Sequence, residues 1–296
     1  MNENKEASVN TKQNGNKATK IAIIATAVLI VCIAAYFGIT KVIIPNRNYN
    51  AAVALMNEGK IVEAYESQVA MNGYKDSAEK AESLYDMYKL LTSNVGDYLS
   101  FGAYEQDNDT SNGKETIEWQ VLAKGNNKIL VISQYALDAK PYNTEYEDIT
   151  WETCTLRIWL NETFLNEAFS EAEQSIIQTS EVPAGRNPKY SIALGNDTED
   201  RIFLLSIDEA NKYFASDEAR MCVPTAYAKA NGARTNDDYK VDGAATCWWW
   251  LRSPGDYLNY AASVDGVGGV RSNGNHVSSG LGCVRPTLWI ELNALS

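Results

Sequence analysis

The sequence predicts an α+β protein that carries one transmembrane helix and a helical stalk ahead of a mixed outer domain. Residues 21–40 contain no charged residue, and residues 49–91 repeat apolar residues at helical spacing. From residue 98 onward, short alternating stretches typical of strands are interleaved with helical patterns. With 296 residues, 45% apolar and 22% charged, the chain is neither a fully disordered protein nor a collagen-like one.

The net charge of −12 is unevenly distributed along the chain. Residues 1–44 are net basic, so the remainder is more acidic than the chain as a whole. Because an acidic surface repels phosphate backbones, the sequence predicts no nucleic-acid partner. The chain contains one histidine, His276, which leaves little basis for histidine-dependent catalysis. No motif indicates a cofactor, so none is expected.

Residues 21–40 form the predicted transmembrane helix. About 20 residues at ~1.5 Å rise cover roughly 30 Å, the thickness of the hydrocarbon core. A cleaved signal peptide and a lipoprotein signal are the alternatives. The apolar run is longer than a signal-peptide core, no small-x-small cleavage site follows it, and Cys32 lies mid-span behind Val31 rather than behind a small residue. The lipid bilayer is therefore the expected partner of this span.

The distribution of basic residues predicts which side of the membrane each part occupies. Four lysines precede the span, and one lysine and one arginine follow it closely: Lys5, Lys12, Lys17, Lys20, Lys41 and Arg47. This bias favours a cytoplasmic N-terminus. Residues 1–20, rich in Asn, Lys and Thr, are expected to form a disordered cytoplasmic tail. The protein is then a single-pass cell-membrane protein with its C-terminal domain extracellular.

Residues 41–94 are predicted to form a helical stalk. Gly59 stands where a helix C-terminus is expected, and residues 72–77, Asn-Gly-Tyr-Lys-Asp-Ser, mark a second break. The segment resembles a single tetratricopeptide-like helical hairpin. One such unit cannot bury a continuous core, so a spacer is favoured over a peptide-binding groove.

In the outer domain, residues 95–296, periodicity predicts strands and helices in alternation. Strands are expected at residues 98–104, 117–122, 128–133 and 202–205, with a hairpin turn at 125–127. Helices are expected at residues 153–165, 207–214 and 225–231, and after the capping-box sequence at 170–173. From residue 247 onward the composition shifts to Trp, Gly, Ser, Asn and Tyr, which indicates short strands and turns.

Two motifs near the C-terminus carry a family resemblance. Residues 248–255 are Trp-Trp-Trp-Leu-Arg-Ser-Pro-Gly, and residues 284–290 are Val-Arg-Pro-Thr-Leu-Trp-Ile. Together with upstream blocks at residues 100–104, 117–122, 150–157, 195–200 and 224–228, they resemble a bacterial family of unknown function over roughly residues 97–292. The resemblance implies a C-type-lectin-like fold of the formylglycine-generating-enzyme branch, whose relatives include ligand-binding proteins diversified by retroelements. Cys222 and Cys283 depart from the family pattern.

The segment between the two motifs is the predicted ligand-binding surface. Residues 256–283 are rich in Gly, Ser, Asn and Tyr, and Tyr supplies rigid contact area while Asn supplies adaptable hydrogen bonds. An ordinary solvated loop is the alternative. The expected ligand is a protein or a glycan. The candidate binding residues are Asp256, Tyr257, Asn259, Tyr260, Ser263, Asp265, Arg271, Asn273, Asn275, His276 and Ser278.

A second set of residues in the two motifs is assigned a structural role. Alternation along a strand puts Trp248 and Trp250 on one face and Trp249 on the other, and large aromatic side chains usually lie in the core. An Arg beside a Pro turn usually pairs with a buried carboxylate or with carbonyls. The structural set is Trp248, Trp250, Arg252, Arg285, Pro286 and Trp289.

Catalytic and metal chemistry find little support in the sequence. His276 follows a predicted turn and is expected on the surface. Asp197, Glu199 and Asp200 lack the other ligands of a calcium loop, so capping is favoured and no metal is expected. Four cysteines allow three full disulfide pairings, which stay open; they are Cys154, Cys222, Cys247 and Cys283.

The sequence therefore predicts a membrane-anchored extracellular recognition or adhesion module that is not an enzyme. Two alternatives remain: a formylglycine-generating-enzyme-like or cell-wall-modifying enzyme, and a structural envelope protein. An enzyme of the first kind is expected to present clustered cysteines, or a histidine with a carboxylate, in a pocket.

Overall fold

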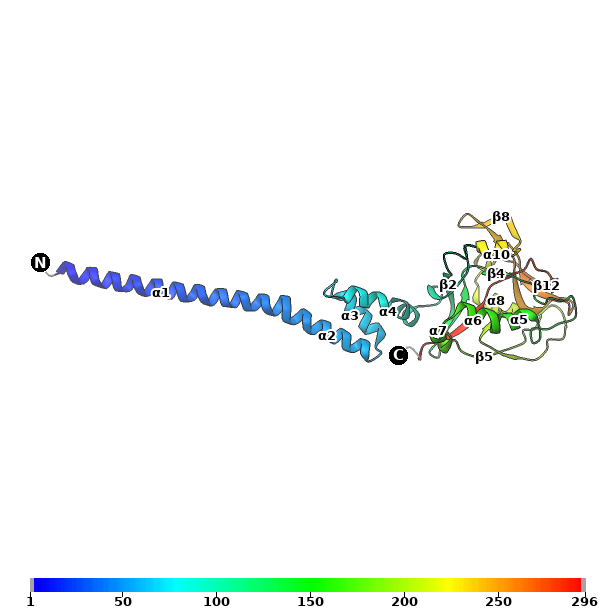
Figure 1. The fold of residues 1–296 in the computed structure, drawn as a ribbon, viewed down its shortest axis with the longest axis horizontal. Helices are drawn as coiled ribbons and strands as arrows, with labels where there is room; N and C mark the ends of the chain where they lie inside the picture. Colours follow the sequence, from blue (N-terminus) through cyan, green and yellow to red (C-terminus); the bar gives the residue numbers. More distant parts are fainter. Residues whose placement is uncertain (1–2, 294–296) are drawn as a thin grey trace. The chain divides into compact units, whose positions relative to one another are not determined.

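The structure is a computed structural model that describes residues 3–293, and it divides the chain into two compact units, residues 1–85 and 86–296. The described part of the first unit consists of helices and their connections (Figure 1). Its elements are α1 (Glu3–Gly38), the π-helical turn η1 (Ile39–Ile43), α2 (Ile44–Asn57), α3 (Ile61–Ala70) and the beginning of α4 (Ser77–Thr92).

One helix is long and apolar enough to cross a membrane. Thr19–Asn57 runs without interruption through η1, has a mean hydropathy of 2.6 in its most apolar window, and buries none of that window. The exposed apolar side chains of that window suit a membrane anchor or a signal sequence. The structure differs from the disordered tail expected before this span, because residues 3–20 continue the same helix. Extending an existing helix is much easier than nucleating a new one, which accounts for the difference.

The short helices of the first unit match the predicted breaks. Gly59 and Gly73, between α2 and α3 and between α3 and α4, both adopt positive φ, the conformation that favours glycine at a helix end. Tyr49 Oη on α2 donates a hydrogen bond to Asp76, just before α4, at 2.5 Å. Ala52 and Ala64 are buried where α2 and α3 pack. The connections between these helices are therefore set by local sequence signals.

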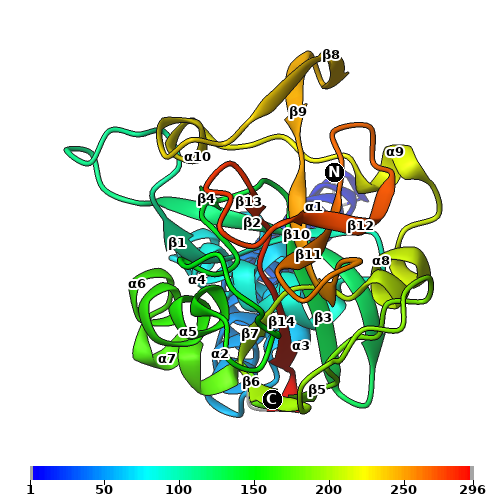
Figure 2. The same cartoon turned by 90° about the vertical axis from the view of Figure 1, so that its right-hand side faces the viewer.

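Two five-stranded sheets form the framework of the second unit (Figure 2). The first has the order β1 (Tyr98–Tyr104), β2 (Glu115–Gly125), β3 (Lys128–Ser133), β14 (Thr287–Glu291) and β7 (Ile202–Phe203). The second has the order β12 (Val270–His276), β11 (Tyr260–Val264), β10 (Trp249–Pro254), β13 (Cys283–Val284) and β4 (Asp138–Ala139). Two separate hairpins are β5 (Ser180–Val182) with β6 (Thr198–Asp200), and β8 (Thr235–Val241) with β9 (Ala244–Cys247).

The first sheet combines a local hairpin, β2–β3, with pairing between strands that are far apart in the sequence. β1 and β3 have the predicted bounds, and the β2–β3 turn places Asn126 and Asn127 at φ 51° and 57°. Asn tolerates that left-handed conformation better than most residues. β14, at the C-terminal end of the described chain, pairs antiparallel with β3 from Thr287 opposite Ile132 to Glu291 opposite Lys128. The C-terminal strand thus lies inside the sheet that begins at residue 98, between β3 and β7.

Short helices connect the two sheets, and two of them begin with a complete capping box. Ser170 and Ser206 each accept a hydrogen bond from the backbone of a Glu three residues later, whose carboxylate accepts from the serine backbone. The helices are α5 (Thr155–Trp159), the π-helical turn η2 (Leu160–Phe164), α6 (Leu165–Ala168), α7 (Glu171–Ile176), α8 (Ile207–Tyr213), α9 (Asp217–Arg220) and α10 (Ala226–Ala230). The second unit is therefore α+β, with strands as its main elements.

The tryptophans of the C-terminal motifs occupy different depths. Trp249 and Trp250 are fully buried, and the Trp248 and Trp250 rings lie on one face with centroids 4.7 Å apart. Trp249 packs on the other face against Phe214, so both faces of β10 are covered. Trp248 and Trp289 are half-buried and pack against the edge of the core rather than inside it. Trp248 precedes the first residue of β10.

The two motif arginines are almost fully buried. Arg252 donates to the carbonyls of Pro183 and Leu204 and forms an ion pair with Glu209. Burial alone would raise the pKa of Glu209, but the charge and hydrogen bonds of Arg252, with those of Ser206, hold it below its usual value. Arg285 Nε donates to the Ser133 carbonyl at 2.8 Å. Through these contacts, both arginines hold segments together that are far apart in the sequence.

Candidate functional site

The predicted binding segment folds mainly as a hairpin of β11 and β12. The turn expected at residues 273–275 lies instead within β12, where the pairing register with β11 shifts. At that irregularity Gly274 has φ 77°, and a Cβ there would lie 2.3 Å from the Ala261 carbonyl oxygen. Only glycine fits this close approach. The segment is therefore more regular, and more buried, than its composition predicts.

A cavity of about 630 Å³ lies between this hairpin and the β8–β9 hairpin. Four predicted binding residues line it: Ser263, Asp265, Arg271 and Asn275. Trp248, Gly266 and the start of β8, residues 234–238, complete its wall. The volume falls in the range of small-ligand sites, and most of the lining side chains are polar.

Asp265 organises the turn at one edge of the cavity. Its Oδ1 accepts hydrogen bonds from the backbone N–H groups of Val267 at 3.1 Å and Gly269 at 2.8 Å. Its Oδ2 pairs with Arg271 Nε at 3.1 Å, which fixes one side of that guanidinium. The Arg271 side chain remains 57% exposed, so it can donate to a bound molecule. Asp265 thus positions Arg271 at the cavity.

The amide of Asn275 is oriented in a similar way. Its Nδ2 donates to Ser263 Oγ at 2.8 Å across the β11–β12 pair. Ser263 lies at the cavity but is fully buried, so it acts through Asn275 rather than through exposed surface of its own. Asn275 is half-buried and presents the rest of its amide to the cavity. Ser263 therefore serves as the support of Asn275.

Contacts at Gly266 hold the β8–β9 hairpin against the β11–β12 turn. Thr246 Oγ1 on β9 donates to the Gly266 carbonyl at 2.6 Å. A Cβ at Gly266 would come within 2.9 Å of Asn236 Cβ, so a larger residue would push β8 away. Figure 2 shows the β8–β9 hairpin extending beyond the sheets, so this contact fixes its base beside the cavity.

The remaining predicted binding residues do not line this cavity. They are Asp256, Tyr257, Asn259, Tyr260, Asn273, His276 and Ser278. Tyr260 Oη lies 2.9 Å from His276 Nε2, and the Tyr146 ring centroid lies 4.9 Å from that of His276. Partial burial, followed by the influence of Tyr146, raises the pKa of Tyr260. Sequence reasoning missed Tyr146, which reaches this Tyr–His cluster from more than a hundred residues away.

One protein-family model matches the part of the chain that contains the cavity. The family model described as a domain of unknown function, DUF6273, matches residues 126–292, more than half of the chain. The chain belongs to the DUF6273 family. No curated protein and no solved structure matches it. The expectation of a family of unknown function is thus confirmed, and the DUF6273 region includes every residue that lines the cavity.

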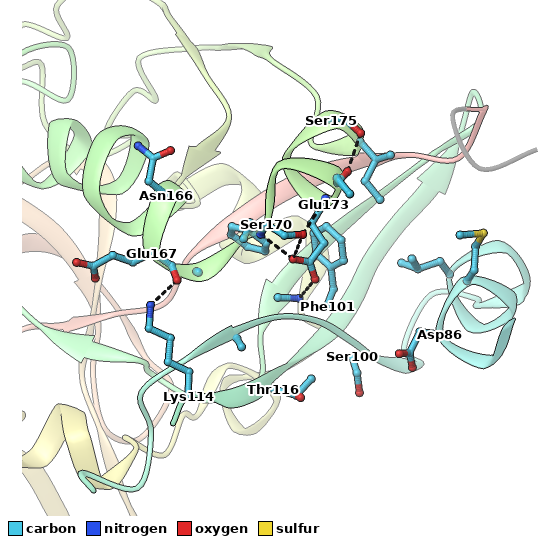
Figure 3. A pocket seen from close by; sticks show the side chains of 18 residues that line it. Asp86, Ser100, Phe101, Lys114, Thr116, Asn166, Glu167, Ser170, Glu173 and Ser175 are labelled. Carbon is cyan, nitrogen blue, oxygen red and sulfur yellow. Dashed lines mark hydrogen bonds between the residues drawn. The ribbon is translucent and has the colours of Figure 1, made fainter. Parts of the chain in front are cut away.

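A second, larger groove of about 790 Å³ is lined partly by β1 and α4, which precede the DUF6273 match, and partly by α6 and α7 (Figure 3). Phe101 and Phe169 lie in its wall with ring centroids 5.2 Å apart. The Glu173 carboxylate already accepts from the Gly102 and Ser170 backbones, as dashed lines in Figure 3 show. This groove therefore offers chiefly apolar surface. The sequence did not reveal it, because its walls come from segments far apart in the chain.

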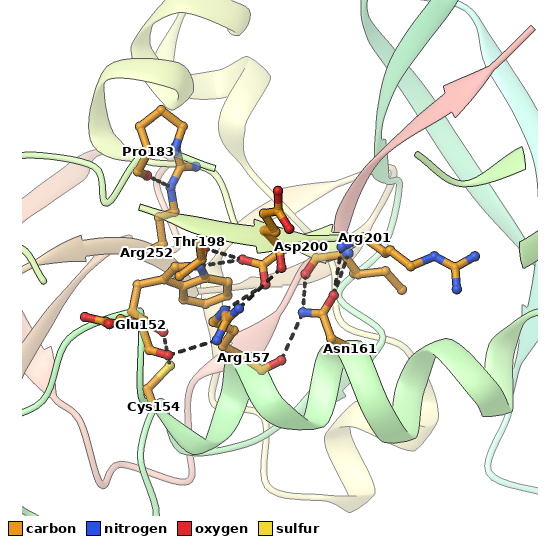
Figure 4. Close-up of polar contacts among 12 residues, drawn as sticks. Glu152, Cys154, Arg157, Asn161, Pro183, Thr198, Asp200, Arg201 and Arg252 are labelled. Carbon is orange, nitrogen blue, oxygen red and sulfur yellow. Dashed lines mark hydrogen bonds and ion pairs between the residues drawn. The ribbon is translucent and has the colours of Figure 1, made fainter. Parts of the chain in front are cut away.

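Two of the three carboxylates considered for calcium, Asp197 and Asp200, have other partners within the DUF6273 region. Asp200 accepts from Arg157 at 2.7 Å, from Trp151 Nε1 at 3.0 Å and from Thr198 Oγ1 at 2.6 Å (Figure 4). Asp197 accepts from the backbone of Ala184. These contacts tie the β5–β6 hairpin to α5 and leave Asp200 without a free face toward solvent.

All four cysteines of the DUF6273 region are buried free thiols. Burial raises the pKa of Cys154 to about 12 and holds the pKa values of Cys222 and Cys247 well above their usual range. The Cys247 backbone N–H donates to the Cys222 carbonyl at 2.8 Å, so these two residues are cross-strand neighbours. Since the thiolate is the reactive form, Cys154, Cys222 and Cys247 are poor nucleophiles in this state.

Proposed function

We propose that the protein is a membrane-anchored recognition module whose outer domain binds a glycan in the cavity between β8–β9 and β11–β12. The observation that supports this most strongly is the composition of the cavity wall. The half-buried ring of Trp248 lies in the same cavity as the oriented side chains of Arg271 and Asn275. An aromatic face stacks on a sugar ring, while amide and guanidinium groups bind its hydroxyls.

The charges at the cavity favour a hydroxyl-rich ligand over a strongly ionic one. Arg234 and Arg271 line it together with Asp237, Asp238 and Asp265, so groups of both charges contribute to the wall. Neither an anion nor a cation bound there would be surrounded only by groups of the opposite charge. A glycan, which offers donors and acceptors without net charge, matches this wall.

We also propose the finer fold assignment, a C-type-lectin-like fold of the formylglycine-generating-enzyme branch, in a bacterial protein. Its support is the resemblance of the motifs at residues 248–255 and 284–290, together with the α+β architecture. The alternative enzyme of that branch depends on reactive cysteines. The raised pKa values of the buried thiols count against that chemistry here.

For the anchor, we propose that residues 21–40, within the helix Thr19–Asn57, hold the chain in the bilayer with its N-terminus in the cytoplasm. The excess of lysines before the apolar span supports this orientation. Treating intact cells with protease is then expected to remove the outer domain while the N-terminal segment survives. Blotting with antibodies against each end provides the measurement. Survival of the outer domain until the cells are lysed would show that the orientation is reversed.

The binding proposal is tested with the full-length chain in detergent micelles on an array of purified glycans. We expect Arg271→Ala to weaken binding to the selected glycan by about thirtyfold, because truncating a central contact residue costs about 2 kcal/mol. The melting temperature is expected to change little, since exposed ion pairs contribute about 0–1 kcal/mol.

Arg186→Ala is the matched control for Arg271→Ala. Arg186 is also an exposed arginine in an ion pair, with Asp208 at 3.3 Å, but it does not line the cavity. Tyr257→Ala tests the exposed residues outside the cavity. Both controls are expected to bind like wild type. Equal losses in Arg271→Ala and Arg186→Ala, or a loss confined to Tyr257→Ala, would place the site elsewhere.

A further inference from the structure

Three carboxylates converge where β1 ends and β2 begins. One oxygen of each of Glu105, Asp107 and Glu115 lies within 4.8 Å of an oxygen of each of the others. The strand register explains this, because Tyr104 pairs directly with Glu115, and Glu105 follows Tyr104. Within the described part of the chain, no ion pair involves these three groups. Three negative charges thus meet without a positive partner.

The burial of Glu105 is an independent sign that this cluster takes a cation. Glu105 is only 8% exposed, and its Oε1 is buried without a hydrogen-bond partner. Its neighbours differ in this respect. Glu115 Oε2 accepts from the backbone of Gln106 at 2.7 Å, and Asp107 Oδ2 accepts from Asn112 Nδ2 at 2.8 Å. A buried, unpaired carboxylate is costly unless it is neutralised or coordinates a metal ion.

We propose that Glu105, Asp107 and Glu115 bind a calcium ion. The donors are all carboxylate oxygens, which suit hard cations rather than zinc or copper. Two of the three lie in the β1–β2 loop rather than on a rigid strand, and calcium accepts irregular oxygen cages where magnesium requires a near-ideal octahedron. The bound ion would join the two ends of this loop. The site precedes the DUF6273 match and does not depend on the proposed glycan site.

Calorimetric titration of CaCl₂ into the full-length chain in detergent micelles tests the proposal. We expect one ion per chain with a dissociation constant of about 0.1–1 mM, the range of extracellular calcium modules. About 10 mM CaCl₂ is then expected to raise the melting temperature of the outer domain by about 4–8 °C. MgCl₂ at the same concentration is expected to give a clearly smaller rise. Absence of calcium binding, or an equal rise with magnesium, would overturn the assignment.

Glu105→Gln is expected to weaken calcium binding by about tenfold or more, since affinity depends on the number of charged ligands. Glu162→Gln is the matched control, because Glu162 is an exposed carboxylate on η2 that lies outside the acidic cluster and outside the pocket beside it. It is expected to bind calcium like wild type. Equal affinity in the two variants would contradict the proposal.

Melting in EDTA separates a calcium ligand from a merely structural carboxylate. Without calcium, Glu105→Gln is expected to melt at or above the temperature of wild type, because it removes a buried, unpaired charge. With calcium, the order is expected to reverse. A Glu105→Gln variant that melts below wild type by the same amount in EDTA and in CaCl₂ would make Glu105 structural and refute the site.

Discussion

Trp250→Ala is expected to lower the free energy of unfolding of the outer domain by about 3–5 kcal/mol, the usual cost of deleting a large buried aromatic side chain. Trp250 is fully buried, donates from Nε1 to the Lys140 carbonyl at 2.9 Å and packs against Tyr142 at a ring-centroid distance of 5.8 Å. A Cβ at Gly282 would lie 2.2 Å from Trp250 Nε1, so the surroundings fit the indole closely. Since whole domains are stable by about 5–15 kcal/mol, this is a large fraction.

Trp289→Ala is the matched control in the second motif. Its ring is half-buried and lies beneath the Lys128 ammonium, with Nζ 4.6 Å from the ring centroid. We expect a loss of about 1–2 kcal/mol, because less apolar area returns to water. Urea titration of both variants in the full-length chain provides the comparison. Equal midpoints would contradict the difference in burial between the two side chains.

Glu209→Ala is expected to cost about 3 kcal/mol, because it leaves the buried Arg252 guanidinium without its counter-charge. Glu209 also completes the capping box of α8, so the two effects must be separated. Glu173→Ala removes the equivalent capping carboxylate of α7, which has no arginine partner among the described ion pairs. We expect that control to cost about 1 kcal/mol. A Glu209→Ala variant as stable as Glu173→Ala would show that the ion pair contributes little.

The same pair predicts a pH dependence of stability. The pKa of Glu209 is lowered in the folded protein from its ordinary value of 4.5, so its contribution is present above that value and is lost as the pH falls through the lower, folded value. Wild type is therefore expected to lose stability below about pH 4.5 more steeply than Glu209→Ala. Melting temperatures at pH 7 and across acidic pH test this. Parallel curves for the two proteins would contradict it.

Local signals determined which elements could be predicted. β1 follows from alternation and β3 from an apolar run beside a turn, while α7 follows from its Ser–Glu capping pair and α8 from its helical pattern. By contrast, β4 and β13 contain two residues each and exist only through pairing with distant strands. Two residues are too few to show the alternation of apolar and polar residues that predicts a strand. Their positions depend on tertiary contacts.

The candidate site was predicted only in part, for a related reason. The β8 strand is polar, Thr-Asn-Asp-Asp-Tyr-Lys-Val, so it lacks the apolar alternation of a strand. The Asp242-Gly243 turn, with φ values of 50° and 82°, is the hairpin signal that could have revealed it. Without β8–β9, half of the cavity wall is missing from a sequence-based account. Trp248 then looks like a core residue rather than part of a binding surface.

Ligand-induced fluorescence of Trp248 tests the central claim most directly, because this indole is the aromatic side chain in the cavity wall. The full-length chain in detergent micelles is titrated with the glycan selected on the array, in parallel with Trp248→Phe, which keeps an aromatic ring against Trp250. We predict a saturable change in tryptophan emission in the wild type that Trp248→Phe lacks. An emission change of the same size in both proteins, at unchanged affinity, would contradict a binding site in this cavity.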